Sequence, residues 1–290
     1  MSDRKKWFVS TEWLAAHLED PAVAIVDGSW HLPGTRREAH KEYLEKHVPG
    51  AAFFDVDTIS DMSNPLPHML PTAKAFAEAV GALGIAETQK IVVYDSVGLS
   101  SAPRVWWTFR LMGAPDVVIL DGGLPKWLAE ARVTESGEAQ FAPRRFNATL
   151  NTKMVRDMSE VRRGISDGTM QLVDARPEPR FVGEAPEPRP WVKSGHIPGS
   201  FNLASSDIVA DGRLKDAAAI RSAFDAAGVD LTRPIVTSCG SGVNAAVLTL
   251  ALETIGVPVE TTALYDGSWT EWGSRSDTEI ATGPGKKPSR

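Results

Sequence analysis

The chain has 290 residues, a formal net charge of −6 and a single cysteine, Cys239. At about 150 residues per domain the length favours two domains, and a hydrophobic share of 42% with 23% charged residues argues against wholesale disorder. One cysteine excludes an intramolecular disulfide and a cysteine-rich zinc site, and a mildly acidic chain carries no electrostatic signature of binding to nucleic acid or an anionic membrane.

The N-terminal segment MSDRKKWFVSTEW lacks the apolar core of a secretory signal peptide. No stretch approaches the roughly 18 consecutive apolar residues that a membrane-spanning helix needs. We therefore expect a cytoplasmic protein without a membrane partner, whose one thiol is inert, redox-sensitive or catalytic.

The first half alternates helical and strand patterns. Residues 72–83 are expected to form a helix, with Thr72 as its N-cap and Gly84 as its stop. The apolar runs 91–94 and 117–120 are continuous rather than alternating, which is typical of buried parallel strands.

The second half repeats this alternation after a polar segment at about 134–152. A helix is expected at 217–227 and a strand at 234–238. Cys239 follows that strand directly, and a strongly apolar helix then runs to about Gly256. Such alternation predicts an α/β fold, with an open, mainly parallel sheet and helices on both faces in each half.

Three landmarks recur in the same order in the two halves, which indicates a duplicated domain. They are a Val-Asp pair, a His-[Val/Ile]-Pro-Gly turn and an Asp-Gly turn followed by tryptophan, anchored at Asp27 and Asp174, His47 and His196, and Asp121 and Asp266. We therefore expect an N-terminal domain at 1–135, a linker at 136–153, a C-terminal domain at 154–280 and a flexible tail at 281–290.

Cys239 opens the segment Cys-Gly-Ser-Gly-Val-Asn between a strand and a helix. Gly240 and Gly242 allow a tight loop whose backbone N–H groups point inward, and the adjacent helix N-terminus adds a positive field. Both effects favour the thiolate, which is the nucleophilic form. The alternative is a small buried side chain with no reactivity.

The duplication offers an internal comparison for this cysteine. Aligning 91–94 with 235–238 places Asp95 opposite Cys239. The N-terminal domain thus has the same frame without a nucleophile, and one active site per chain is expected, in the C-terminal domain.

These residues resemble the tandem rhodanese-domain sulfurtransferases: the two His-[Val/Ile]-Pro-Gly elements, the Asp95/Cys239 asymmetry and the paired Asp-Gly turns carry the resemblance from about Trp7 to Trp272. It implies two rhodanese-like domains. Within that family the loop is similar to that of the 3-mercaptopyruvate sulfurtransferases, whereas thiosulfate-using rhodaneses carry a basic Cys-Arg-Lys-Gly loop. Asn244 departs from the threonine usual in the family.

The resemblance implies a substrate site beside the loop. Arg180 and Arg189 match the arginines that hold the substrate's carboxylate and carbonyl oxygens, a role that suits the planar guanidinium. The loop residues that line this site are Gly240, Gly242, Val243 and Asn244. Without the resemblance, an equally good interpretation is that both arginines are solvated side chains of a stiff surface loop.

The resemblance also implies a proton relay. Asp57 and His68 match the segment that supplies an Asp–His pair to the serine of the cysteine loop, here Ser241. Such a set would protonate the pyruvate enolate that leaves when the C–S bond of 3-mercaptopyruvate breaks. Without the resemblance, this segment is interpreted as a Pro-rich loop with one histidine.

The implied activity is transfer of sulfane sulfur from 3-mercaptopyruvate through a Cys239 persulfide to cyanide or a thiol, such as thioredoxin or a small thiol. No metal or organic cofactor is needed. A thiosulfate sulfurtransferase and a persulfide-carrying regulatory module remain alternatives. A cysteine phosphatase is disfavoured, because it needs an arginine where this chain has Ala245.

Overall fold

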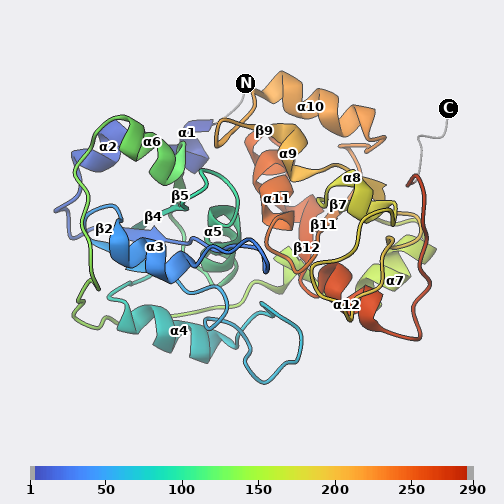
Figure 1. Ribbon diagram of the computed structural model, residues 1–290, viewed down its shortest axis with the longest axis horizontal. Coiled ribbons are helices and arrows are strands. Elements are labelled where there is room, and N and C mark those ends of the chain that lie inside the picture. Colours follow the sequence, from blue (N-terminus) through green and yellow to red (C-terminus); the bar gives the residue numbers. More distant parts are fainter. Residues whose placement is uncertain (1–3, 286–290) are drawn as a thin grey trace. The chain divides into compact units, whose positions relative to one another are not determined.

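The structure is a computed structural model and describes residues 4–285. The described chain divides into two compact units, residues 4–151 with 211–213 and residues 152–210 with 214–285 (Figure 1). They are called the N-terminal and the C-terminal unit below.

The N-terminal unit contains a five-stranded, fully parallel sheet in the order β1-β5-β4-β2-β3. Its strands are β1 (Phe8–Val9), β2 (Val23–Asp27), β3 (Ala51–Phe53), β4 (Lys90–Tyr94) and β5 (Val117–Leu120). Its helices are α1 (Arg4–Trp7), α2 (Thr11–Ala15), α3 (Ala39–Glu45), α4 (Ala73–Ala82), α5 (Ala102–Leu111) and α6 (Gly123–Ala129).

The C-terminal unit contains a second parallel five-stranded sheet, in the order β6-β12-β11-β7-β8. Its strands are β6 (Val155–Arg156), β7 (Gln171–Asp174), β8 (Phe201–Asn202), β11 (Ile235–Ser238) and β12 (Thr262–Tyr265), and a separate two-stranded sheet pairs β9 (Val209–Ala210) with β10 (Arg213–Leu214). Its helices are α7 (Met158–Ser166), α8 (Glu178–Phe181), α9 (Ser205–Ile208), α10 (Ala217–Ala226), α11 (Ala245–Thr254) and α12 (Ser268–Ser274), with 3₁₀ turns η1 (Thr152–Met154) and η2 (Val259–Thr261).

The two five-stranded sheets share one topology, which confirms the predicted α/β fold. In each unit the strand that precedes the cysteine or its counterpart is central, since β4 lies between β5 and β2 and β11 lies between β12 and β7. The following helix packs on that strand, α5 on β4 and α11 on β11. Every residue of α11 is buried, which explains the continuous apolar pattern after Cys239.

Local sequence signals explain individual helix ends. Thr72 caps α4, its Oγ1 accepting a hydrogen bond of 3.2 Å from the amide of Ala75, and Gly84 follows with a φ of 73°. Between 136 and 151 the chain carries no helix or strand. Its backbone donates hydrogen bonds of 2.8 Å from Gly137 to the Leu44 carbonyl and from Arg144 to the Gly81 carbonyl.

The end of the chain is described to residue 285, so residues 286–290 of the predicted tail lie outside the described part. Ala281 exchanges backbone hydrogen bonds with His196, and the Gly283 amide donates to the carbonyl of Val182 at 2.8 Å. These bonds hold the described end of the segment 281–285 against the C-terminal unit.

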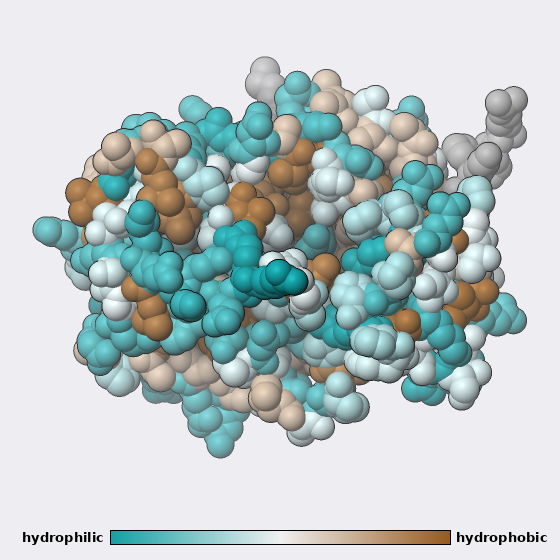
Figure 2. Space-filling model, viewed as in Figure 1, coloured by the Kyte–Doolittle hydropathy of each residue, from teal (hydrophilic) through white to brown (hydrophobic). Residues whose placement is uncertain are grey.

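Large apolar side chains are mostly buried within the two sheets' cores. The exposed exceptions among the described residues are Leu32, Met62, Val97, Leu128, Val133, Leu150 and Trp191. Figure 2 shows the face in view, on which polar residues predominate and apolar ones are scattered. None of the described helices is long and apolar enough to span a bilayer.

Each unit has an aspartate at the end of a matching strand, but the two carboxylates have different partners. Asp174 ends β7 and pairs with the buried guanidinium of Arg176 at 2.7 Å. Asp27 ends β2, but the residue matching Arg176 is Ser29, which offers only hydrogen bonds. Burial therefore raises the pKa of the Asp27 carboxyl to about 6, despite these bonds from Ser29.

This raised pKa makes stability depend on pH. Between about pH 4 and pH 6 the folded state binds the Asp27 proton more tightly than the unfolded state, so the free energy of unfolding falls as pH rises through this window. From pH 4 to pH 7 the Asp27 carboxyl should lower the free energy of unfolding of the wild type by about 3 kcal/mol. Asp27→Asn should remove this decrease, and urea unfolding of both proteins across the pH range measures it.

An exposed carboxylate of the other unit provides the control for this measurement. Asp225→Asn should leave the wild-type pH dependence unchanged, because Asp225 lies in solvent on α10. An Asp27→Asn variant with the same pH dependence as wild type would show that burial does not hold a proton on Asp27.

Candidate active site around Cys239

Cys239 lies at the carboxyl end of the central strand β11, one short loop before α11. It is buried, with 3% of its surface exposed. In parallel α/β sheets the carboxyl ends of the strands are where ligands bind. The predicted strand-to-helix position of the cysteine is therefore confirmed.

The backbone of Cys239 and Gly240 is held by the start of α12. The Trp269 amide donates to the Cys239 carbonyl at 3.0 Å, and the Thr270 amide and hydroxyl donate to the Gly240 carbonyl at 2.8 and 2.6 Å. The Cys239 amide donates to the Oγ of Ser268 at 3.2 Å. Every one of these groups is fixed by α12, which follows β12 in the same sheet.

The remaining loop residues turn the chain into α11. Gly242 has a φ of 77°, a left-handed conformation that glycine adopts without cost. Ser241 and Val243 are buried, and Asn244 stands at the N-cap of α11. The Asn244 side chain donates its amide to the hydroxyl of Ser205 on α9 at 3.3 Å instead of capping the helix.

The N-terminal unit shows what this type of loop binds. Both carboxylate oxygens of Asp95 accept hydrogen bonds of 2.7–2.9 Å from five backbone amides, those of Val97, Gly98, Ser100, Ser101 and Ala102. The loop between β4 and α5 is thus an anion-binding nest filled by its own carboxylate. In the C-terminal unit Cys239 follows the corresponding strand, β11, and precedes α11.

A buried charge network lies beside the cysteine loop. Arg176 donates to Asp174 at 2.7 Å and to Glu187 at 2.8 Å, and its guanidinium lies 4.6 Å from the ring centre of Trp269. Arg180 donates to the same Glu187 through Nε at 3.2 Å and Nη2 at 2.5 Å. Glu187 therefore orients two guanidinium groups, one wholly buried and one partly exposed.

The partly exposed guanidinium reaches the loop itself. A methyl group added at Gly240 would lie 3.2 Å from Nη2 of Arg180. A larger residue at position 240 would therefore crowd the guanidinium of Arg180. The predicted closeness of Arg180 to the cysteine loop fits this geometry.

Arg189 lies two residues after Glu187 in the same loop, and its carbonyl accepts a hydrogen bond of 3.0 Å from Val192. It is half-buried. Its predicted contact with a substrate stays a prediction.

Asp57 and His68 form a pair in the N-terminal unit. His68 Nε2 lies 2.8 Å from Oδ1 of Asp57, which also accepts a hydrogen bond of 3.1 Å from Trp30. The backbone of His68 has a φ of 61°, in the left-handed region that residues other than glycine rarely adopt. Its carbonyl accepts a hydrogen bond of 2.6 Å from Nη2 of Arg104. Strain of this kind costs about 1–3 kcal/mol and clusters at functional sites.

Ser241 belongs to the C-terminal unit, and the Asp57–His68 pair to the N-terminal unit. Their assembly into one relay stays a prediction. The pair itself joins a buried histidine ring to a largely exposed carboxylate.

Several supporting residues were not singled out by the sequence reasoning. Trp30 and Arg104 hold the Asp57–His68 pair, Glu187 holds Arg180, and Ser268 holds the Cys239 amide. Only Ser268 stands in a recurring motif, where the other copy has glycine. No group of three or more potential metal ligands occurs among residues 4–285.

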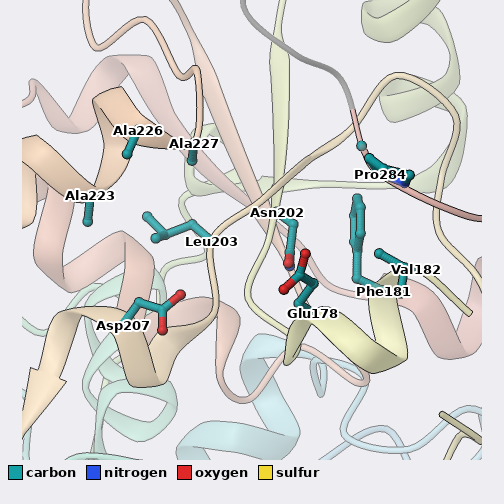
Figure 3. A pocket seen from close by; sticks show the side chains of 11 residues that line it. Glu178, Phe181, Val182, Asn202, Leu203, Asp207, Ala223, Ala226, Ala227 and Pro284 are labelled. Atoms are coloured by element: carbon teal, nitrogen blue, oxygen red, sulfur yellow. The ribbon is translucent and has the colours of Figure 1, made fainter. Parts of the chain in front are cut away.

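A pocket of about 450 Å³ opens elsewhere in the C-terminal unit (Figure 3). Its lining comes from α8, β8, α9, α10 and residues 284–285 and includes the carboxylates of Glu178 and Asp207, but neither Cys239 nor Arg180. Two carboxylates disfavour an anionic ligand such as a 2-oxo acid. The cysteine loop is therefore the better candidate for that chemistry.

Comparison with known proteins agrees with the duplicated fold. The family model of the rhodanese-like domain matches twice, at residues 10–130 and 157–275. The crystal structure of SseA, described as a 3-mercaptopyruvate sulfotransferase from Escherichia coli, superposes with a TM-score of 0.84 at 42% identity, covering 91% of this chain and 99% of that chain.

Curated relatives extend over nearly the whole chain. The 3-mercaptopyruvate sulfurtransferase of Escherichia coli is 43% identical and that of Homo sapiens 42%, covering 94% and 96% of this chain and 97% and 96% of the relatives. The thiosulfate sulfurtransferase of Bos taurus is 42% identical, covering 96% of this chain and 95% of its own. With two matched domains and relatives along its whole length, the chain belongs to the rhodanese-like domain family, among its two-domain sulfurtransferases.

Proposed function

We propose that the protein is a 3-mercaptopyruvate sulfurtransferase whose nucleophile is Cys239. The observation that carries the proposal is the placement of this thiol in a loop whose counterpart surrounds the Asp95 carboxylate with five amides. Cys239 stands at the matching position, between β11 and the N-terminus of α11, and the anionic form of a cysteine is its nucleophilic species.

The first half-reaction forms one bond and breaks another. The Cys239 thiolate attacks the sulfur of 3-mercaptopyruvate, an S–S bond forms, and the C–S bond breaks with its electron pair on carbon. The leaving group is the enolate of pyruvate, which takes a proton to become pyruvate. Ser241, relayed by His68 and Asp57, is proposed to supply that proton.

The second half-reaction returns the enzyme to its starting state. A thiolate or cyanide attacks the outer sulfur of the Cys239 persulfide and leaves with it, regenerating the Cys239 thiolate. Since the sequence has no second cysteine, the acceptor is external, and thioredoxin or a small thiol is proposed. A cytoplasmic location is part of the same proposal.

The donor is assigned from the loop and not from overall identity. Relatives named for 3-mercaptopyruvate and for thiosulfate are 43% and 42% identical to this chain, so identity does not separate the two donors. Gly240 and Ser241 bring no positive charge, and Gly240 leaves space for Arg180. A planar guanidinium suits the carboxylate and carbonyl oxygens of a 2-oxo acid.

Thiosulfate sulfurtransferase is the second candidate, favoured by the high identity to the bovine relative of that name. Comparing kcat/KM for the two donors decides between them. We expect a preference for 3-mercaptopyruvate of about tenfold or more. A preference for thiosulfate would reverse the donor assignment and leave the class of enzyme standing.

A persulfide on Cys239 is the direct test of the proposal. Reduced protein incubated with 3-mercaptopyruvate and no acceptor should gain about 32 Da, one sulfur atom, and release about one pyruvate per chain. Intact-mass and peptide spectra measure the first, and a coupled pyruvate assay the second. Cys239→Ser should do neither, and pyruvate release by that variant at the wild-type rate would overturn the proposal.

Arg180→Lys tests the substrate-binding role. Lysine keeps the charge but loses the planar fork, so one charge-assisted contact of about 1.5–3 kcal/mol is weakened. We expect KM for 3-mercaptopyruvate to rise about tenfold or more, with a smaller change in kcat. Arg275→Lys, which alters an exposed pair with Asp277 in the same unit, is the matched control. An unchanged KM in Arg180→Lys would remove Arg180 from the site.

A further inference from the structure

Ser268 combines a strained backbone with a hydrogen bond to the cysteine. We propose that Ser268 is a positioning residue, whose hydroxyl fixes the backbone amide of Cys239 and thereby the place of its sulfur. The proposal rests on the proposed role of Cys239 as the nucleophile and adds a residue whose side chain acts on the reaction only through Cys239.

The Ser268 hydroxyl is buried and makes hydrogen bonds both as an acceptor and as a donor. Ser268 has no exposed surface, and its Oγ accepts the Cys239 amide at 3.2 Å while donating to the carbonyl of Tyr265 at 2.8 Å. One side chain thus ties the end of β12 to the end of β11. Because a buried amide without an acceptor is costly, the Cys239 amide stays directed at this oxygen.

The backbone of Ser268 adopts a conformation that serine disfavours. Its φ is 50°, in the left-handed region where a side chain is strained. Glycine would take this conformation without cost. A strained serine in a fully buried turn indicates that the side chain contributes something that glycine lacks.

The N-terminal unit allows an internal comparison at this position. Gly123 stands at the matching position, with a φ of 56°. The Leu124 amide donates to the Asp95 carbonyl at 3.1 Å, just as the Trp269 amide donates to the Cys239 carbonyl at 3.0 Å. Both copies thus place a left-handed residue before the same amide contact. The turns differ elsewhere, since Gly122 has a φ of 87° and Gly267 one of −65°, and Pro125 lacks the amide that Thr270 donates to Gly240.

The copy without a nucleophile has no room for that group. A Cβ on Gly123 would lie 2.7 Å from the Asp95 carbonyl oxygen and 2.9 Å from the Cα of Gly98. There the Asp95 carboxylate pins its loop through five amides. A thiol cannot replace this two-oxygen anchor, and in the C-terminal unit Ser268 ties down the cysteine's own amide.

The consequence for reactivity follows from the short distance between amide and sulfur. The Cys239 sulfur is attached through Cβ to the same Cα as the amide nitrogen. If the backbone rotates so that the amide can reach another acceptor, the sulfur moves as well. Nucleophilic attack is sensitive to misplacement of the reacting atoms by about 1 Å. Losing the hydroxyl should therefore slow sulfur transfer without affecting donor affinity.

Two substitutions in the full-length chain separate the hydroxyl from the strain. Ser268→Gly removes the hydroxyl and relieves the backbone, so the lost hydrogen bonds and the relieved strain offset each other in stability. Ser268→Ala removes the hydroxyl and keeps the strain, so it should melt lower than Ser268→Gly. Both should lower kcat about tenfold or more and leave KM for 3-mercaptopyruvate within about twofold.

Alkylation of Cys239 by iodoacetamide gives a readout independent of the donor. Its rate over pH 6–9 should fall in both variants, and persulfide formation should slow by a similar factor. Ser274→Gly, at the exposed end of the same helix, is the matched control and should match wild type in every measurement.

The outcomes separate the two proposals. A Ser268→Gly variant with wild-type kcat and alkylation rate overturns the positioning role, as does one whose activity falls only in step with its melting temperature. If wild type forms the persulfide and Cys239→Ser does not, the proposed function stands whatever Ser268 does. If Cys239→Ser turns over at the wild-type rate, the proposed function fails first.

Discussion

Backbone amides that converge at the start of a helix need a negative charge or a strong acceptor at their centre, and the loop between β4 and α5 of the N-terminal unit has this requirement. In the N-terminal unit the need is met internally, since Asp95 places its carboxylate among five amides. In the C-terminal unit a cysteine follows the corresponding strand. The same strand-to-helix position therefore holds a structural carboxylate in one copy and the proposed nucleophile in the other.

A second constraint is the burial of charge beside that turn. Arg176 is almost fully buried and is stabilised by Asp174 and Glu187 together. Glu187 also accepts hydrogen bonds from Arg180, whose guanidinium lies beside Gly240. The buried Arg176 thus helps to fix the partly exposed Arg180 through their shared partner. Removing one member of such a network leaves an unpaired charge, which costs more than the network itself contributes.

Prediction from the sequence worked best where the signal is local or repeated. The helix at 72–83, the continuous apolar strands and the cysteine between strand and helix were all predicted from periodicity and turn residues, and the observed elements confirm them. The duplication predicted one sheet topology twice, and the two sheets have the same strand order. Arg180 required the family resemblance, because an arginine in a loop has no pattern of its own.

What the sequence determined by itself is the α/β frame, its duplication and the place of the one cysteine that we propose as the nucleophile. Periodicity, glycine turns and a lone cysteine are all visible along the chain. Only the tertiary structure decided which groups hold that side chain. Ser268 reaches the Cys239 amide across 29 residues, and Glu187 joins Arg176 to Arg180. Such contacts depend on how parallel strands bring their carboxyl ends to one edge, and no local spacing in the sequence encodes them.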